Sequence, residues 1–312
     1  SSNSISVFRN TSTSGSITSG SFVAKVDFTT GSNPVSVAIG DLDGDGKFDI
    51  AVTNSNAGNV SVFRNTSTNG SISTSSFAAK IDYLTGSNPY SVAIGDLDGD
   101  GNQDLVIANN GSDNVSVLRN YITGGTLTVN SFATLINVAV GSEPRSVAIG
   151  DLNEDGRPDI VVANQSSNTV SVLRNNSSSG SIFFGSISPK VDFTTGSSPR
   201  SVAIGDLDGD GKADLIVANN ASNTISVLRN TGSIGAFGAF LSSSFATKVD
   251  FSVGSFPLSA TVADLDGDRK SDIVAVNTGS NSLALLRSTN NISFLNSLAL
   301  SSGTLSPDFA SA

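Results

Sequence analysis

The chain contains no cysteine, histidine, methionine or tryptophan. Without cysteine it has neither disulfide bonds nor zinc–thiolate sites, and without histidine it lacks the commonest general base and any Ser-His-Asp triad. Charged residues make up only 14% of the 312 residues. No apolar run approaches the roughly 20 residues that a membrane-spanning helix needs. An enzyme built from this chain would depend on carboxylates, lysine, tyrosine or a metal ion.

The sequence is rich in apolar, small and hydroxyl-bearing residues, with 38% hydrophobic residues and 31 glycines. This composition is typical of a packed chain with an uncharged surface and not of a disordered polyelectrolyte. The net charge of −10 could suggest a basic partner, but the acidic residues are concentrated in a few short stretches. No basic stripe or aromatic platform is present, so nucleic acid is not an expected partner.

One of these acidic stretches, residues 206–214, has the composition of a metal loop. Carboxylates stand at its first, third, fifth and ninth places, and glycines at the fourth and sixth, where a loop must turn back sharply. A hard cation such as Ca²⁺ takes six to eight oxygen ligands at about 2.3–2.6 Å, which short acidic side chains on a tight loop supply. The stretch therefore predicts a calcium site.

The same stretch occurs five times, as loops 1 to 5 in chain order: 41–49, 96–104, 151–159, 206–214 and 264–272. Their first aspartates follow one another at intervals of 55, 55, 55 and 58 residues, a period that indicates a repeat array. If each loop binds one Ca²⁺, five ions cancel the net charge. The predicted side-chain ligands are Asp41, Asp43, Asp45, Asp49, Asp96, Asp98, Asp100, Asp104, Asp151, Asn153, Asp155, Asp159, Asp206, Asp208, Asp210, Asp214, Asp264, Asp266, Asp268 and Asp272.

Each repeat carries four short β-strands, as residues 199–254 illustrate. Residues 199–205 alternate bulky and small side chains, which predicts a strand, and residues 214–219 form a short apolar run of strand type. Residues 224–230 and 245–251 are the third and fourth strands. No stretch long enough for a helix shows helical periodicity.

A unit of four antiparallel strands cannot bury both of its faces alone, and radial stacking of such units solves the problem. The alternative, a linear β-solenoid, has much shorter repeats. We therefore predict an all-β fold: one β-propeller domain, residues 1–312, of four-stranded blades. The five full blades are predicted at 34–86, 89–141, 144–196, 199–254 and 257–301.

The two ends of the chain predict a sixth, incomplete blade. Residues 1–31 match the third and fourth strands of a repeat, residues 294–300 are a weak fourth strand of the last full blade, and residues 303–312 stand where a first strand would begin. Closure of the ring within one chain is the favoured interpretation. The alternative is that the open edge accepts a strand from another copy, which would give a filament.

These repeats resemble the FG-GAP or VCBS repeats, the calcium-loop blades also found in the propellers of integrin α-subunits. The resemblance rests on residues 201–211, on residues 214–218 and on the third strand, and it covers nearly the whole chain. It implies that the carboxylates at places one, three, five and nine hold the metal, together with a backbone carbonyl at place seven. Those carbonyls would belong to Lys47, Asn102, Arg157, Lys212 and Lys270.

Two loops depart from the pattern. Loop 3 has Asn153 and Glu154, so it has one charge fewer among its ligands, and loop 5 has Arg269 where the other loops have glycine. If that place needs a positive φ, Arg269 is strained and loop 5 is the weakest site. An EF-hand loop needs an acidic residue at the twelfth place, which is apolar in every copy, so that interpretation fails. A hydrogen-bonded Asp/Gly turn without metal is the remaining alternative.

Two other sets of charged residues recur. The third strands end in Arg9, Arg64, Arg119, Arg174, Arg229 and Arg287, and the fourth strands carry Asp27, Asp82, Asp192 and Asp250. Ion pairs from strand to strand are the favoured interpretation, and a ligand-binding ring is the alternative.

The expected function is that of a non-enzymatic, secreted or surface-attached calcium-binding propeller, used for adhesion or as a structural subunit of an extracellular assembly or filament. Its expected partners are calcium, copies of itself through the incomplete blade, or a surface protein or glycan. A lectin-like, carbohydrate-binding propeller is the alternative, although tryptophan is absent and Tyr83, Tyr90 and Tyr121 are the only tyrosines. A polysaccharide-active enzyme is the third possibility.

Overall fold

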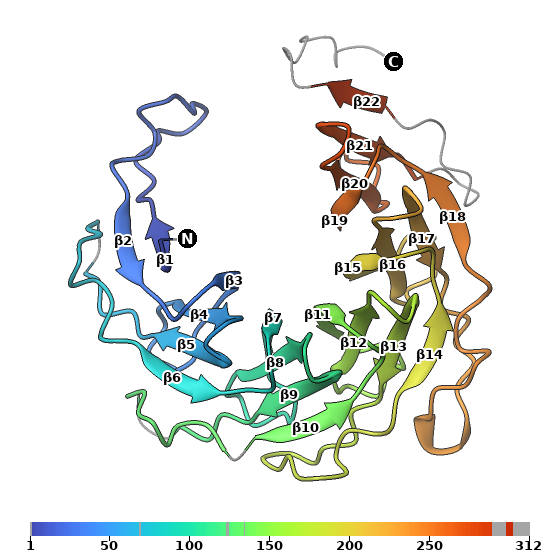
Figure 1. Ribbon diagram of the computed structural model, residues 1–312, viewed down its shortest axis with the longest axis horizontal. Helices are drawn as coiled ribbons and strands as arrows, with labels where there is room; N and C mark the ends of the chain where they lie inside the picture. The colour runs from blue at the N-terminus through green and yellow to red at the C-terminus, as the bar shows by residue number, and fades with distance from the viewer. Residues whose placement is uncertain (1, 69, 123–124, 134, 289–297, 302–312) are drawn as a thin grey trace. The chain divides into compact units, whose positions relative to one another are not determined.

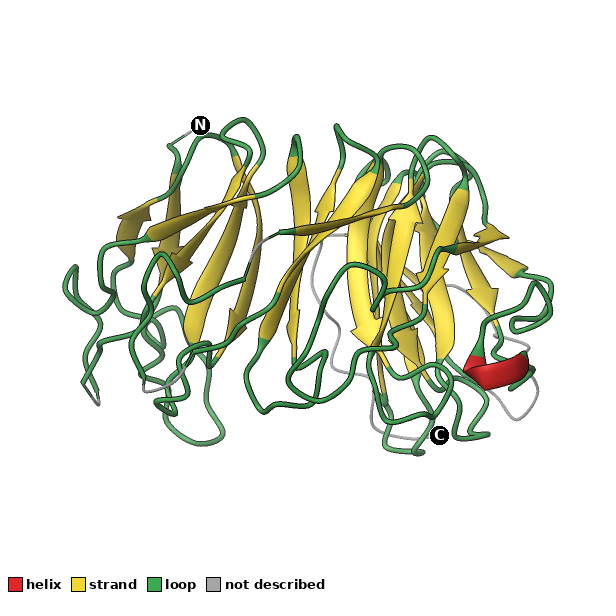
Figure 2. Cartoon of the chain, turned by 90° about the horizontal axis from the view of Figure 1, so that it is seen from below, coloured by secondary structure: helices red, strands yellow, loops and turns green. Residues whose placement is uncertain are grey.

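The computed structural model describes residues 2–68, 70–122, 125–133, 135–288 and 298–301 (Figure 1). This part of the chain consists of strands, turns and loops with a single short 3₁₀ helix, η1 (Ala236–Gly238) (Figure 2). It contains five four-stranded sheets, here called blades 1 to 5, and one two-stranded sheet, here called the half-blade. The predicted all-β fold of repeated blades is confirmed. No helix in the described residues has the length and apolar character needed to cross a membrane.

The strands of each blade lie in chain order, so that consecutive strands are hydrogen-bonded neighbours. Blade 1 consists of β3 (Pro34–Gly40), β4 (Asp49–Asn54), β5 (Asn59–Phe63) and β6 (Ile81–Leu84). Blade 2 consists of β7 (Pro89–Gly95), β8 (Asp104–Asn109), β9 (Asn114–Leu118) and β10 (Ile136–Ala139). Blade 3 consists of β11 (Pro144–Gly150), β12 (Asp159–Asn164), β13 (Thr169–Leu173) and β14 (Val191–Thr194).

Blades 4 and 5 repeat this pattern. Blade 4 consists of β15 (Pro199–Gly205), β16 (Asp214–Asn219), β17 (Thr224–Leu228) and β18 (Val249–Ser252). Blade 5 consists of β19 (Pro257–Ala263), β20 (Asp272–Asn277), β21 (Ser282–Leu286) and β22 (Leu298–Ser301).

The half-blade pairs β1 (Ser4–Val7) with β2 (Val26–Thr29) in antiparallel register. That these are the third and fourth strands of a closing blade stays a prediction. β22 gives blade 5 its fourth strand and pairs with β21. The predicted closing strand, residues 303–312, lies outside the described residues, as do residues 294–297 of the predicted fourth strand.

The described chain divides into two compact units. Unit 1 comprises Ser1–Ile149, Arg157–Val162 and Leu173–Lys190, and unit 2 comprises Gly150–Gly156, Ala163–Val172 and Val191–Ala312.

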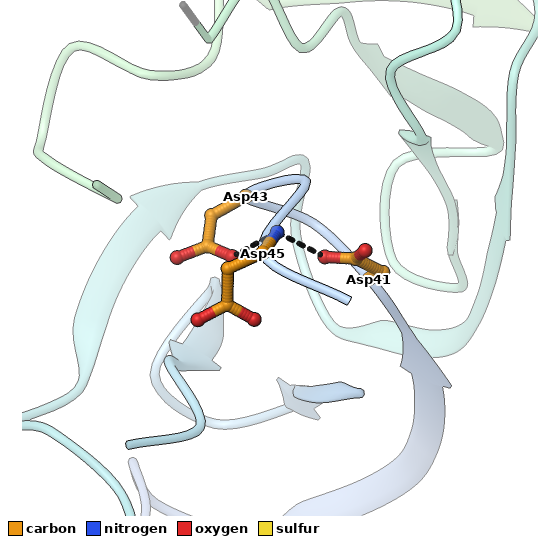
Figure 3. Close-up of side chains that lie close together, drawn as sticks. All are labelled: Asp41, Asp43 and Asp45. Carbon is orange, nitrogen blue, oxygen red and sulfur yellow. Dashed lines mark hydrogen bonds between the residues drawn. The ribbon is translucent and has the colours of Figure 1, made fainter. Parts of the chain in front are cut away.

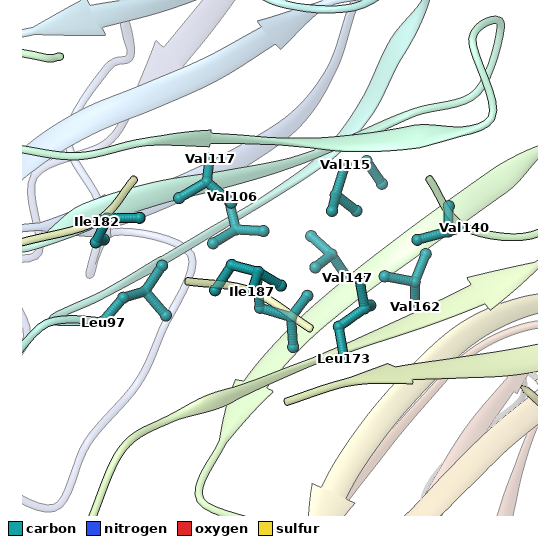
Figure 4. Packing of buried hydrophobic residues seen from close by; sticks show 12 residues of the cluster. Leu97, Val106, Val115, Val117, Val140, Val147, Val162, Leu173, Ile182 and Ile187 are labelled. Carbon is teal, nitrogen blue, oxygen red and sulfur yellow. The ribbon is translucent and has the colours of Figure 1, made fainter. Parts of the chain in front are cut away.

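Within each unit the apolar faces of neighbouring blades pack on one another. In unit 1, Val106 and Val117 of blade 2 pack with Val147, Val162 and Leu173 (Figure 4). In unit 2, side chains of β16 and β17 pack with side chains of β19 and β20. Every residue of the second strand is buried in blades 1 to 4, because that strand lies in the middle of its sheet with packed faces on both sides. This agrees with the argument that one blade cannot bury both of its faces alone.

We predict that Ile107→Ala lowers the free energy of unfolding by about 2–5 kcal/mol, because Ile107 is fully buried between blades and its truncation leaves a cavity. Ile17 is 81% exposed, so Ile17→Ala is the matched control and changes stability by less than about 0.5 kcal/mol. Urea unfolding of both variants measures the difference. Equal destabilisation by the two substitutions would contradict the observed packing.

Candidate metal centres in the five acidic loops

Each acidic loop joins the first strand of a blade to the second. The last residue of the first strand pairs with the ninth-place aspartate at the start of the second strand, as in Gly95↔Asp104 and Gly205↔Asp214. Because the two strands pair in an antiparallel hairpin, the first and ninth places of the loop lie close together. Strand pairing thus positions the two ends of each predicted site.

The first-place aspartate shapes the turn by accepting backbone hydrogen bonds. In loop 1, Asp41 Oδ1 accepts the N–H of Gly44 at 2.8 Å, and Asp41 Oδ2 accepts the N–H of Gly46 at 2.9 Å. The N–H of Asp45 lies between Asp41 and Asp43 and donates to both at 3.2 Å (Figure 3). Loops 2, 4 and 5 repeat the bonds to the fourth-place and sixth-place residues.

Four loops gather acidic oxygens closely enough to hold a metal ion. In each of them three aspartates offer oxygens that all lie within 4.8 Å of one another. The groups are Asp41, Asp43 and Asp45; Asp96, Asp98 and Asp104; Asp206, Asp208 and Asp210; and Asp264, Asp266 and Asp272. Loop 3, with Asn153, gives no such group among the described residues. The contribution of the seventh-place carbonyls stays a prediction.

Loop 2 holds a buried oxygen that fits a cation. Asp98 is 3% exposed, and its Oδ2 accepts a hydrogen bond from Arg119 Nε at 2.5 Å. Its Oδ1 is buried and has no hydrogen-bond partner among the described residues. A buried acceptor without a partner costs about 1–3 kcal/mol, more when it is charged. A Ca²⁺ ion, which prefers carboxylate oxygens, would satisfy this atom.

The ninth-place aspartates are buried and doubly hydrogen-bonded. Asp104 Oδ2 accepts the N–H of Leu97 at 2.9 Å, and Oδ1 accepts the N–H of Asn120 at 2.7 Å. Burial raises the pKa of Asp104 to about 7, because the two hydrogen bonds do not fully offset the loss of water and nearby carboxylates add repulsion. The pKa values of Asp49 and Asp214 are raised to about 6 for the same reasons.

Three of the recurring arginines, Arg64, Arg119 and Arg287, bind the acidic loops of their own blades. Arg119 Nη2 donates to Asp100 at 2.7 Å in addition to its Nε bond with Asp98. Arg64 and Arg287 pair in the same way with the third- and fifth-place aspartates of loops 1 and 5. For Arg64, Arg119 and Arg287 the interpretation of strand-to-strand pairs with the fourth-strand aspartates is therefore wrong.

The fourth-strand aspartates have other partners. Ser61 Oγ donates to Asp82 at 2.6 Å, and Lys80, two residues before Asp82, forms an ion pair with it. Asp27 and Asp250 have the same two kinds of partner, and Asp192 accepts a bond from Ser171. The sequence did not predict the ion-pair partners of these arginines, although each arginine lies at a fixed number of residues from its loop. The reason is that the third strand ends beside the loop only in the folded blade.

The sixth place of the loops has the positive φ on which the argument about loop 5 depends, and the weakness of loop 5 as a metal site stays a prediction. The sixth place has a φ of +83° to +89° wherever it is glycine, and Arg269 has a φ of +68°. A side chain in this left-handed region is strained. Glu154 in loop 3 has a φ of +59° at the fourth place, a second strained position that the sequence reasoning missed. Leu265, the second residue of loop 5, is 53% exposed, whereas its equivalent Leu97 is fully buried.

Comparison with known proteins points to one family. The profile described as "FG-GAP-like repeat" matches residues 1–52, 41–107, 96–162, 151–217 and 206–275. No curated protein sequence matches the chain.

Several solved structures share the fold at low identity. A putative 6-phosphogluconolactonase from Bacteroides uniformis has a TM-score of 0.60 at 13% identity, over 96% of this chain and 78% of that one. An Agrocybe aegerita lectin that recognises non-reducing terminal N-acetylglucosamine has a TM-score of 0.56 at 18% identity, over 96% and 80%. A functionally unknown protein from Desulfotomaculum acetoxidans has a TM-score of 0.55 at 16% identity, over 88% and 72%.

We predict that Arg269→Gly raises the free energy of unfolding by about 1 kcal/mol, because glycine adopts the left-handed conformation without strain. The reciprocal change in loop 4, Gly211→Arg, should lower stability by a similar amount. Urea unfolding without added metal measures both variants. A destabilising Arg269→Gly would show that the arginine side chain contributes more than its backbone costs.

We predict that calcium binding releases protons at neutral pH. The folded-state pKa of Asp104 is raised above its ordinary value of 3.8 to about 7, so this carboxyl is partly protonated at pH 7 without metal. In the metal-free protein its contribution to stability is therefore full below about pH 4 and is lost as pH rises through 7. Metal binding needs the ionised form, so calcium affinity should fall from pH 8 to pH 6. Calcium titration calorimetry in two buffers of different ionisation enthalpy measures the protons, and identical heats would refute their release.

Proposed function

The chain belongs to the FG-GAP repeat family, and from this premise we propose that it is a non-enzymatic calcium-binding propeller protein of the cell surface or extracellular space. It would serve adhesion or act as a structural subunit of an extracellular assembly. The observation that carries the proposal is the buried Asp98 Oδ1, which lacks a hydrogen-bond partner among the described residues in a loop where three aspartates converge.

The residues present suit calcium as the bound ion. The carboxylates at places one, three, five and nine, with a backbone carbonyl at place seven, supply hard oxygen ligands. The arginines support this use, since Arg119 holds the Oδ2 of Asp98 and leaves Oδ1 available. Extracellular calcium modules bind at about 10⁻⁴–10⁻³ M, a concentration that extracellular fluids supply and cytosol does not.

A structural role for the metal is favoured over a catalytic one. Carboxylates from four places and a carbonyl leave little room for a substrate around the ion. Binding to the folded state alone would add about 2.7 kcal/mol per site at a hundredfold excess of calcium over its dissociation constant. The ions would thus act as clips that hold the hairpins of the blades.

The tyrosines give little support to carbohydrate binding, the alternative function. Tyr83 is buried, and its hydroxyl donates to the carbonyl of Thr128 at 2.5 Å. The Tyr90 ring is covered by the Arg145 guanidinium, whose carbon lies 4.3 Å from the ring centroid. Tyr121 is the most exposed of the three tyrosines, at 43%. The three tyrosines therefore do not give each repeat the same exposed ring, which repeated sugar pockets would need.

The half-blade is where an assembly of copies would join. Among the described residues β1 pairs with β2 on one side only, and an unpaired strand edge is a template for association. Beside it, Val37 and Ile39 of blade 1 are 56% and 63% exposed, whereas the equivalent Val92 of blade 2 is 7% exposed. A strand and loop added to the half-blade would cover these side chains.

We predict that removing calcium with a chelator lowers the melting temperature by roughly 5 °C or more, and that added calcium restores it. Asp98→Asn should reduce this response, because it removes charge from a ligand of loop 2. Asp27→Asn changes an exposed aspartate outside the loops and should keep the full response. Differential scanning calorimetry measures the shifts, and a melting temperature indifferent to both chelator and calcium would refute the proposal.

A further inference from the structure

A buried asparagine after the third strand reaches from one blade to the loop of the preceding blade. Asn120 Nδ2 donates to the carbonyl of Leu42 at 2.7 Å. Asn175 Nδ2 donates to the carbonyl of Leu97 at 2.6 Å. Within unit 2, Asn230 Nδ2 donates to the carbonyl of Leu152 at 2.8 Å. All three asparagines are at most 2% exposed, so these bonds are made away from water, where a lost partner is costly.

The carbonyl that receives this bond belongs to the second residue of an acidic loop. Leu42 stands between Asp41 and Asp43, and its own N–H donates to Asp49 Oδ2 at 2.9 Å. The position of the Leu42 backbone is therefore tied to three of the predicted ligands of loop 1. An ion that fixes these aspartates also fixes the group that Asn120 binds.

The same asparagine is tied to the loop of its own blade. The backbone N–H of Asn120 donates to Asp104 Oδ1 at 2.7 Å, and its Nδ2 also donates to the carbonyl of Gln103 at 3.1 Å. Asn120 thus joins loop 1 to loop 2. In unit 1 the bonds continue through the series Asp49, Leu42, Asn120, Asp104, Leu97, Asn175 and Asp159. Unit 2 has its own series, Leu152, Asn230, Asp214, Leu207, Ser288, Asp272 and Leu265.

We propose that these asparagines couple calcium binding in neighbouring blades, so that an ion in one loop strengthens binding in the adjacent loop. The inference rests on the proposed function, since it needs calcium in the loops. Its physical basis is that each asparagine is oriented by a ninth-place ligand of one loop and restrains the backbone between two ligands of the other. A coupling of this kind is a free energy shared between two sites and acts equally in both directions.

Loop 5 and blade 1 differ from this pattern in the exposure of the equivalent side chains. In loop 5 the equivalent residue, Leu265, is 53% exposed. Asn65 in blade 1 has a backbone N–H bonded to Asp49 at 2.7 Å, like the other asparagines. Its Nδ2 donates to Phe48 of its own blade at 2.9 Å, and the side chain is partly exposed. Asn120, which forms a hydrogen bond to the preceding blade, is thus fully buried, whereas Asn65, which bonds within its own blade, is partly exposed.

The test uses terbium as a luminescent substitute for calcium in the full chain. The sequence has no tryptophan, so Lys47→Trp places a single one at the seventh place of loop 1, where the backbone carbonyl is the expected ligand. Excitation of this tryptophan reports terbium in loop 1. Adding Asn120→Ala, a change in blade 2, should weaken terbium binding in loop 1 by about five- to tenfold, the worth of one buried hydrogen bond.

Asn109→Ala is the matched control in the same blade. Asn109 is fully buried like Asn120, but its Nδ2 donates to Asn114 and Ser116 and to neither loop. It should leave terbium binding in loop 1 unchanged even if it lowers stability. If Asn120→Ala prevents folding, Asn120→Ser replaces it, because Ser288 makes the equivalent bond to Leu207 at 3.1 Å and this variant should bind with intermediate affinity.

A double-mutant cycle tests the coupling itself. Asp96→Asn, which weakens loop 2, should weaken terbium binding in loop 1 when Asn120 is present and should have no effect when Asn120 is alanine. If the Lys47→Trp protein binds no terbium, the proposed calcium site is wrong. If terbium binds and neither Asn120 variant changes its affinity in loop 1, the calcium site stands and the proposed coupling is overturned.

Discussion

The buried carboxylate at the ninth place of each loop is the interaction on which each blade depends. In blade 2, the Asp104 carboxylate accepts hydrogen bonds from the N–H of Leu97, at the start of loop 2, and from the N–H of Asn120, just after the third strand. It thereby joins these two segments. A charge in this position is costly, and its raised pKa is the measure of that cost. Hydrogen bonds offset part of the cost, and a bound cation would offset the rest, so that metal binding would be coupled to folding.

The second constraint is that a thin sheet has two faces to bury. Clusters such as the one around Val106 and Val162 bury the face of one blade against the next, so stability is distributed over interfaces between neighbours. The blades are not buried to the same extent at equivalent positions. Val37 of blade 1 and Leu265 of blade 5 are exposed, whereas their equivalents in blade 2, Val92 and Leu97, are buried.

Local features of the structure could be predicted because they follow from local rules. The alternation of Val202 and Ile204 with small residues predicted a strand, and β15 occupies that stretch. The glycine at the sixth place predicted a sharp turn, and Gly211 has a φ of +87° there. The partners of the arginines could not be predicted in this way, because alternation and spacing do not say which of several aspartates a long side chain reaches.

The sequence by itself determined the repeat, the strands of each blade and the loops in which acidic oxygens gather, since each depends on residues close together in the chain. Only the tertiary structure decided that Arg119 holds Asp98 and that Asn120 binds Leu42, 78 residues away. These contacts depend on how the third strand ends beside the loop and on how one blade packs against the next. Such packing is set by the shapes of whole faces, which no short stretch of sequence specifies.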